Sequence, residues 1–154
     1  MITIKLRILI FILAAIIGFA AYLFFNRSNP VLYRHVDRAS VQYSSFVILN
    51  PFRNREPERQ AEVVLQRLKN RNCQQALSLL ALDAEHTMSL CEREQKYLLA
   101  NWRLMDYQGD RQKVKLIYNL YRESDAGDYL SPPAWIEVEK INGEWLATSY
   151  QTYY

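Results

Sequence analysis

The chain has 154 residues and a formal net charge of +3 at pH 7. Eleven tyrosines and three tryptophans, with only four glycines and five prolines, exclude a disordered or fibrous chain, because such chains are poor in aromatic residues. Beyond the apolar N-terminus the charge is close to neutral. We therefore expect no nucleic-acid binding, which requires many cations against phosphates.

The stretch from Ile8 to Phe25, ILIFILAAIIGFAAYLFF, contains no charged side chain. Its eighteen residues would span about 27 Å as a helix, which matches the hydrocarbon thickness of a bilayer. We predict a transmembrane helix over 8–25 after a short basic leader over 1–7. A cleaved signal peptide, cut near the Gly-Phe-Ala at 18–20, is the alternative. The aromatic residues that follow favour an uncleaved anchor.

The charges that flank this stretch do not orient it. Lys5 and Arg7 lie on one side, and a similar number of arginines follows on the other. The only two cysteines, Cys73 and Cys91, both lie in the rest of the chain. An even pair in an exported domain suggests a disulfide, which would place that domain outside the cytoplasm. Two buried, reduced thiols are the alternative.

Residues 26–56 form a connector whose local structure the pattern leaves open. Val36, Tyr43 and Val47 fall on one face at helical spacing, whereas the β-branched and aromatic content favours a strand. The segment is too apolar to be a free linker. We expect it to pack on the domain or on the membrane surface.

Residues 57–154 are expected to form one globular domain that begins with helices. Pro57 suits a first helical position, and one apolar stripe follows at helical spacing, formed by Ala61, Val64, Leu65 and Leu68. A short second helix is predicted over 73–81. The Ser89–Glu92 capping box predicts a long third helix that runs to about Tyr107, with Gly109 as its cap.

The second half of the domain reads as strands. Apolar residues alternate over 113–123, and a second strand is predicted over 134–140. Asn142-Gly143 is a strong hairpin signal and leads into a third strand over about 144–152. A two-residue turn would pair Val138 with Ala147. Strict alternation then places Trp145 on one face of the hairpin, and Trp135 and Tyr150 on the other.

Helices followed by an antiparallel meander predict an α+β fold. This order of elements, with its closing strand, Asn-Gly turn and Glu144-Trp145-Leu146 strand, resembles the nuclear transport factor 2-like (cystatin-like) superfamily over about residues 57–154. The resemblance implies helices packed on a curved antiparallel sheet that together form a cone. It also implies a bacterial protein of the inner membrane, single-pass, with its domain on the periplasmic or extracytoplasmic side.

The chemistry-bearing residues form no catalytic, metal or cofactor motif, and we expect no cofactor. His86 lies beside Asp83 and Glu85, but no other His or Cys has structural-zinc spacing. We expect a non-enzymatic interaction or scaffold domain. Its protein partners are unknown, and a homo-oligomer is one of the assemblies that we consider. Its surface would include Trp135, Tyr150, Tyr153 and Tyr154. The alternative is a ligand-binding or enzymatic cone with a pocket lined by Trp102, Tyr118 and Trp145.

Overall fold

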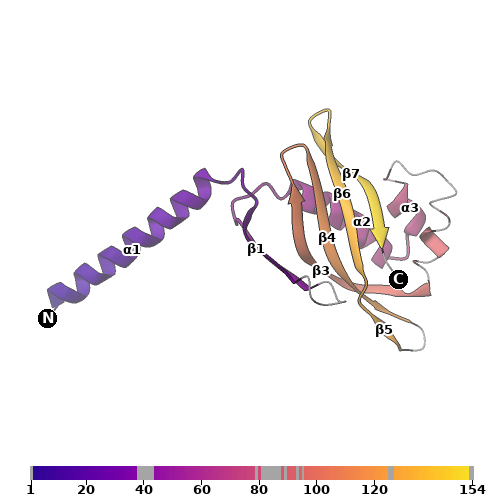
Figure 1. Cartoon of the computed structure of the whole chain (residues 1–154), viewed down its shortest axis with the longest axis horizontal. Coiled ribbons are helices and arrows are strands. Elements are labelled where there is room, and N and C mark those ends of the chain that lie inside the picture. The colour runs from indigo at the N-terminus through magenta and orange to yellow at the C-terminus, as the bar shows by residue number, and fades with distance from the viewer. Residues whose placement is uncertain are drawn as a thin grey trace.

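A computed structural model describes residues 2–37, 44–78, 80, 88, 90–92, 94, 96–124 and 127–152. A long N-terminal helix leads through a β-hairpin into an α+β domain (Figure 1). In chain order the elements are α1 (Ile2–Phe25), β1 (Val31–Asp37), β2 (Ser44–Leu49), α2 (Glu56–Lys69), α3 (Cys73–Leu77), β3 (Leu98–Gly109), β4 (Lys113–Glu123), β5 (Tyr129–Leu130), β6 (Pro133–Ile141) and β7 (Glu144–Thr152). The expected α+β class is confirmed.

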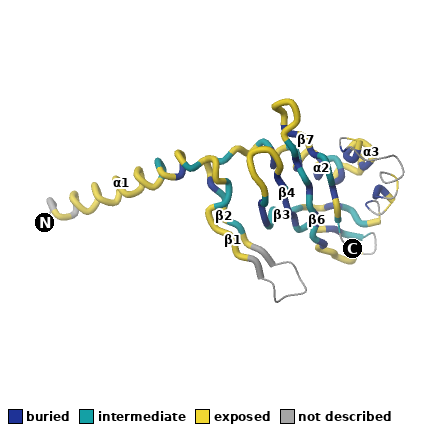
Figure 2. Tube along the Cα trace, turned by 45° about the horizontal axis from the view of Figure 1, so that its top comes forward, coloured by how far each residue is buried: buried dark blue, intermediate teal, exposed yellow. Residues whose placement is uncertain are grey.

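Helix α1 projects away from the domain, and nearly all of its side chains are exposed (Figure 2). Its segment from Leu6 to Phe25 is long and apolar enough to cross a membrane. An apolar helix with no protein surface against it would be unfavourable in water, because burial of apolar surface is the main stabilising term.

The domain is built on an antiparallel sheet in the order β3-β4-β6-β7, with the short β5 paired to the end of β4. Helix α2 packs across one face, which we call the inner face, and contacts all four long strands. Its stripe of Ala61, Val64, Leu65 and Leu68 is buried, as the helical spacing predicts. The core lies between this stripe and the alternating residues of the sheet.

Strand β4 has the bounds that its alternation predicts, and Val114, Leu116 and Leu120 are fully buried on the inner face. Both turn residues of the β6–β7 hairpin have positive φ, 52° at Asn142 and 91° at Gly143. The predicted pair of Val138 with Ala147 is present.

The predicted long helix is wrong from Leu98 onward, because residues 98–109 form β3, whereas residues 90–92, 94 and 96 are helical. Strand β4 pairs with β3 from Leu98 to Gly109, and this tertiary pairing overrides the local helix signal. Gly109 is therefore a hairpin residue and not a helix cap. Its φ is 132°, and an added Cβ would lie 2.1 Å from the backbone oxygen of Lys113.

The connector forms strands and not a helix. Strands β1 and β2 pair as a separate two-stranded sheet, whose β2 lies beside β3. On its inward side the side chain of Arg34 bridges to Asp106, with 2.8 Å between Nε and Oδ1. Asp106 and its cross-strand partner Ile117 are both buried on the outer face of the main sheet. The connector thus packs on the domain and covers part of that face.

Candidate functional site

Asn50 joins the end of α1 to the domain. It is fully buried, and its side-chain amide donates to the carbonyl oxygens of Leu23 (3.0 Å) and Asn26 (3.2 Å). Its backbone N–H donates to the carbonyl oxygen of Pro30 at 2.8 Å. The last carbonyls of a helix have no partner within the helix, so Asn50 supplies donors that α1 itself lacks. The apolar helix and the domain are therefore held in one defined geometry.

Aromatic side chains surround this junction. The rings of Phe24 and Phe52 meet edge to face with 5.8 Å between centroids, and Phe24 also contacts Phe25 at 6.0 Å. All three side chains are largely exposed. Aromatic residues at the end of an apolar helix are typical of the level where hydrocarbon gives way to lipid headgroups.

Directly beyond the aromatic residues lies a cavity of about 550 Å³. It is formed where four parts of the chain meet: the segment after α1, the start of α2, and the β3–β4 and β6–β7 hairpin turns, all at one end of the domain (Figure 1). Trp145 and Tyr107 line its domain side. Four cationic side chains also line it, those of Arg27, Arg53, Arg111 and Lys140.

The cavity carries an excess of positive charge. Arg53 is neutralised, because its Nε and Nη2 atoms bond both carboxylate oxygens of the buried Glu58 at 2.6 and 2.7 Å. Within the described part of the chain, Arg111 and Lys140 form no ion pair. Among the described residues Arg27 also forms no ion pair, and its guanidinium carbon lies 5.4 Å from the centroid of the Phe24 ring.

Asp110 is the one acid among the residues that line the cavity. The backbone N–H groups of Gln112 and Lys113 donate to its carboxylate and lower its pKa, so Asp110 is ionised near neutral pH. Burial raises the pKa of the neighbouring Tyr107 to about 12, so this phenol stays neutral. The lining therefore has two positive charges that no acid of the cavity balances.

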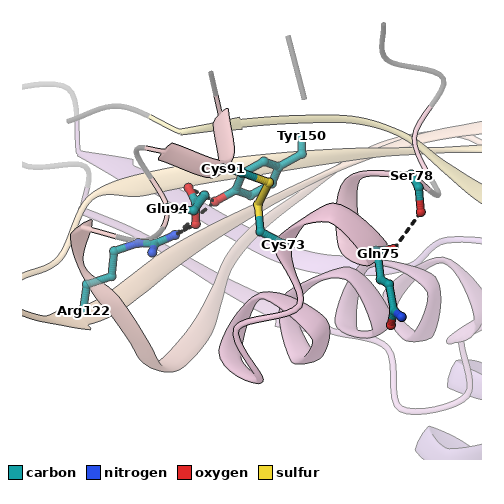
Figure 3. The surroundings of a disulfide bond; sticks show 7 residues. All are labelled: Cys73, Gln75, Ser78, Cys91, Glu94, Arg122 and Tyr150. Carbon is teal, nitrogen blue, oxygen red and sulfur yellow. Dashed lines mark hydrogen bonds and ion pairs between the residues drawn. A yellow bond between two sulfur atoms is a disulfide. The ribbon is translucent and has the colours of Figure 1, made fainter. Parts of the chain in front are cut away.

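A second cluster, of polar and charged side chains, is buried on the inner face near the C-terminal end of β4 (Figure 3). Arg122 pairs with Glu94 and donates to the carbonyl oxygen of Tyr97 at 2.9 Å and to the hydroxyl of Tyr150 at 3.2 Å. The Tyr150 hydroxyl in turn donates to Glu94 at 2.9 Å. Loss of one member of such a buried pair typically costs about 3–5 kcal/mol, because the other charge is left without compensation.

A disulfide joins Cys73, the first residue of α3, to Cys91 (Figure 3). Its second cysteine precedes Glu94 by three residues. The covalent bond and the Arg122 cluster thus hold the same stretch of chain, one against α3 and the other against the sheet. We interpret this cluster as structural, since it fixes the segment before β3 to the core.

The outer side of the β1–β2 hairpin is apolar and uncovered. Tyr33 lies opposite Ile48, and His35 opposite Phe46, so these four side chains share one face. Tyr33, Phe46 and Ile48 are about half exposed. We call this set of residues, Tyr33, His35, Phe46 and Ile48, the hairpin face.

The three residues predicted to line a pocket lie in different surroundings. Trp145 lines the cavity at the end of α1, whereas Trp102 and Tyr118 are not among its lining residues. Tyr118 is buried in the core, and Trp102 packs against that core with Lys69 5.8 Å from its ring centroid. Between α2 and the inner face of the sheet lies the buried core, of which Tyr118 is part.

The predicted interaction surface is also divided. Trp135 is half-buried on the outer face, with the ammonium of Lys115 4.3 Å from its ring centroid. Tyr150 is 2% exposed and points into the core, so its placement on a surface is wrong. Tyr153 and Tyr154 lie outside the described residues, as do Asp83, Glu85, His86 and Ser89.

A β-bulge explains the inversion of Tyr150. Glu137 pairs with Ser149 and Val138 pairs with Ala147, which leaves Thr148 as an extra residue in β7. One extra residue reverses the alternation beyond it, so Tyr150 follows Ala147 onto the inner face.

Arg122 and Asn50 are among the residues of these sites that sequence reasoning missed. Arg122 occupies the next inward position after Leu120 in the alternation of β4, and an inward arginine signals a buried acid partner. Asn50 stands in an Asn-Pro turn, where no local signal shows that its side chain reaches back to α1.

No family profile and no curated protein matches this chain. Solved structures are similar in fold. A variant of a protein named Rd1NTF2_05 shares 10% identity over 65% of this chain and 98% of its own, with a TM-score of 0.53. A SEC-C motif containing protein from Rhodopseudomonas palustris shares 10% over 64% and 80%, with a TM-score of 0.49. An NTF2-like protein from Campylobacter jejuni shares 11% over 60% and 97%, with a TM-score of 0.39.

At these identities the likeness concerns the fold alone. The domain has an NTF2-like fold, in which α2 packs on a curved antiparallel sheet. The resemblance inferred from the order of elements is thereby confirmed.

Proposed function

We propose that the chain is a single-pass protein of the bacterial inner membrane, anchored by α1, whose NTF2-like domain is a non-enzymatic interaction module outside the cytoplasm. The length and apolarity of α1 and the aromatic residues at its end support the anchor. The Cys73–Cys91 disulfide supports the compartment, because such bonds persist in oxidising environments.

The hairpin face is the observation that carries the interaction role. Its inward side is anchored to the domain by Arg34 and Asp106, whereas Tyr33, Phe46 and Ile48 stay exposed on the other side. Contiguous exposed apolar side chains on a soluble domain typically mark a contact surface. The partner we propose is another protein in or at the same membrane, a second copy of this chain included.

The small-ligand alternative retains one supporting observation. Trp145, one of its three proposed pocket residues, lines the cavity at the end of α1. Trp102 and Tyr118 do not join it there, so an enzymatic cone has less support than an interaction module.

The hairpin face can be tested by photo-crosslinking in native membranes. A photoreactive residue at Phe46 should yield a discrete product heavier than the chain alone. The same residue at Tyr129, which is 77% exposed on β5, serves as the matched control and should yield none. A product at twice the chain mass would identify a second copy.

Replacement of Ile48 by Ser should weaken the crosslink from Phe46, because apolar contact at the face is reduced. An absence of protein crosslinks from Phe46, or equal crosslinking from Tyr129, would contradict the proposal.

A further inference from the structure

We propose that the cavity at the end of α1 binds the phosphate of an anionic phospholipid headgroup from the membrane in which α1 is anchored. This inference rests on the membrane anchoring in the proposed function and goes beyond an interaction role. It concerns a different part of the molecule from the hairpin face.

Position is the first argument. Arg27 lies two residues beyond the last residue of α1, and Phe52 lines the cavity and also contacts Phe24 of the helix. Asn50 fixes this geometry by its bonds to the carbonyl oxygens of Leu23 in α1 and of Asn26 just beyond it. If α1 spans the hydrocarbon, the cavity lies at headgroup depth and lipid phosphates surround its mouth.

Charge is the second argument. Arg27, Arg111 and Lys140 converge on the cavity from three separate segments, and Asp110 is the one acid that lines it. Asp110 stays ionised and accepts two backbone N–H groups of its own turn, so its single negative charge leaves an excess of two positive charges for a ligand from outside. Guanidinium and ammonium groups are the side chains that bind phosphate oxygens most strongly.

Shape is the third argument. A volume of about 550 Å³ is of the size that holds a small ligand or a headgroup. Trp145 and Phe52 supply apolar surface beside the cations. A lipid headgroup has the same combination, with a charged phosphate next to glycerol and the start of the acyl chains, whereas free phosphate would use only the cations.

The experiment uses the full chain in detergent micelles, with equal amounts of phosphatidylglycerol and phosphatidylcholine, and counts retained lipids by native mass spectrometry. The wild type should retain phosphatidylglycerol in preference to phosphatidylcholine. Each contributing cation near a membrane surface is worth about a fivefold change in binding. Arg111→Glu with Lys140→Glu should therefore reduce the preference at least tenfold.

A matched control distinguishes lipid binding in the cavity from a general effect of net charge. Arg103→Glu with Lys96→Glu makes the same change in charge at exposed positions that do not line the cavity, and should leave the preference intact. Arg111→Gln with Lys140→Gln, a milder pair, should also lose the preference and guards against misfolding of the charge-reversed chain. Equal loss in the control variant would overturn the proposal.

Glycerol phosphate added to the wild type separates lipid from a soluble phosphate. Displacement of phosphatidylglycerol by glycerol phosphate at the same concentration would show that the site serves a soluble ligand and would overturn the lipid assignment. Extraction of native membranes with alkaline carbonate tests the anchor independently. A chain that stays in the membrane but shows no headgroup preference retains the proposed anchoring and loses this inference.

Discussion

Individual buried polar residues decide how this domain is assembled. Arg122, Glu94 and Tyr150 satisfy one another in the core and hold the segment before β3 to the sheet. Asp106 is fully buried on the other face and accepts from Arg34 and from the backbone N–H of Tyr107 at 2.8 Å. Buried charges persist only when paired in this way.

The buried hydroxyl of Tyr118 leads to a prediction. Its hydroxyl is buried and has no hydrogen-bond partner within the described residues. Tyr118→Phe should therefore raise the free energy of unfolding by about 1 kcal/mol, since the desolvation cost of an unpaired hydroxyl disappears. Thermal unfolding of the full chain in detergent measures this change. Tyr121→Phe, at an exposed position of the same strand, is the control and should have little effect. A destabilised Tyr118→Phe would show that the hydroxyl is bonded.

The Tyr118 phenol also makes the free energy of unfolding depend on pH. Burial, followed by Glu62 and Glu58, raises the pKa of Tyr118 above its usual value of 10, and Tyr107 is raised to about 12. The unfolded chain therefore loses these protons first. Stability from these groups is complete below pH 10 and falls as the pH rises from 10 toward 12. Tyr118→Phe should flatten this fall, whereas an unchanged slope would contradict the raised pKa.

At the scale of elements, the structure that a residue adopts depends on the element that packs beside it. Gly109 is predicted to end a helix, yet it is the last residue of β3, beside the turn in which Asp110 accepts from the backbone N–H groups of Gln112 and Lys113. Leu98, Trp102 and Met105 recur at helical spacing, and only the pairing with β4 selects the strand.

The disulfide is a covalent restraint between α3 and the segment before β3. In the chain-entropy model, closure of the loop from Cys73 to Cys91 stabilises the fold by about 3 kcal/mol. Reduction should therefore lower the unfolding midpoint of the full chain, and a Cys73→Ala, Cys91→Ala chain should show the lower midpoint with or without reductant. Counting free thiols in native membranes tests the compartment. Two reactive thiols in the unreduced protein would contradict both the bond and the proposed exported location.

At the scale of the whole molecule, the apolar helix and the domain are joined by packing and not only by a linker. Asn50, Phe52 and the β1–β2 hairpin lie between them, so the direction of α1 relative to the sheet is set by the fold. A fixed direction would hold the cavity and the hairpin face at constant heights above a bilayer that α1 crosses.

The packed junction between α1 and the domain leads to a prediction. Asn50→Ala removes the donors to Leu23 and Asn26, which should loosen α1 relative to the domain. Spin labels at Tyr22 and Arg103 should then give a broader distance distribution by electron paramagnetic resonance. Asn101→Ala is the control, because the exposed Asn101 side chain bonds only the neighbouring N–H of Trp102. A distribution that stays narrow in Asn50→Ala would show that the hairpin alone fixes the joint.

The sequence by itself determined whatever depends on local periodicity or turn chemistry. The apolar helix, the stripe of α2, the alternation of β4 and the Asn142-Gly143 turn all follow from residues close to one another in the chain. Their order was enough to indicate an NTF2-like α+β fold.

Only the tertiary structure decided what depends on distant partners. Residues 98–109 became a strand because β4 lies beside them, and Tyr150 turned inward because one extra residue in β7 shifts its phase. The cationic cavity unites Arg27, Arg111 and Lys140 across more than a hundred positions of the chain. Local patterns record which side of its own element a residue faces. They contain no information on which other element that side will meet.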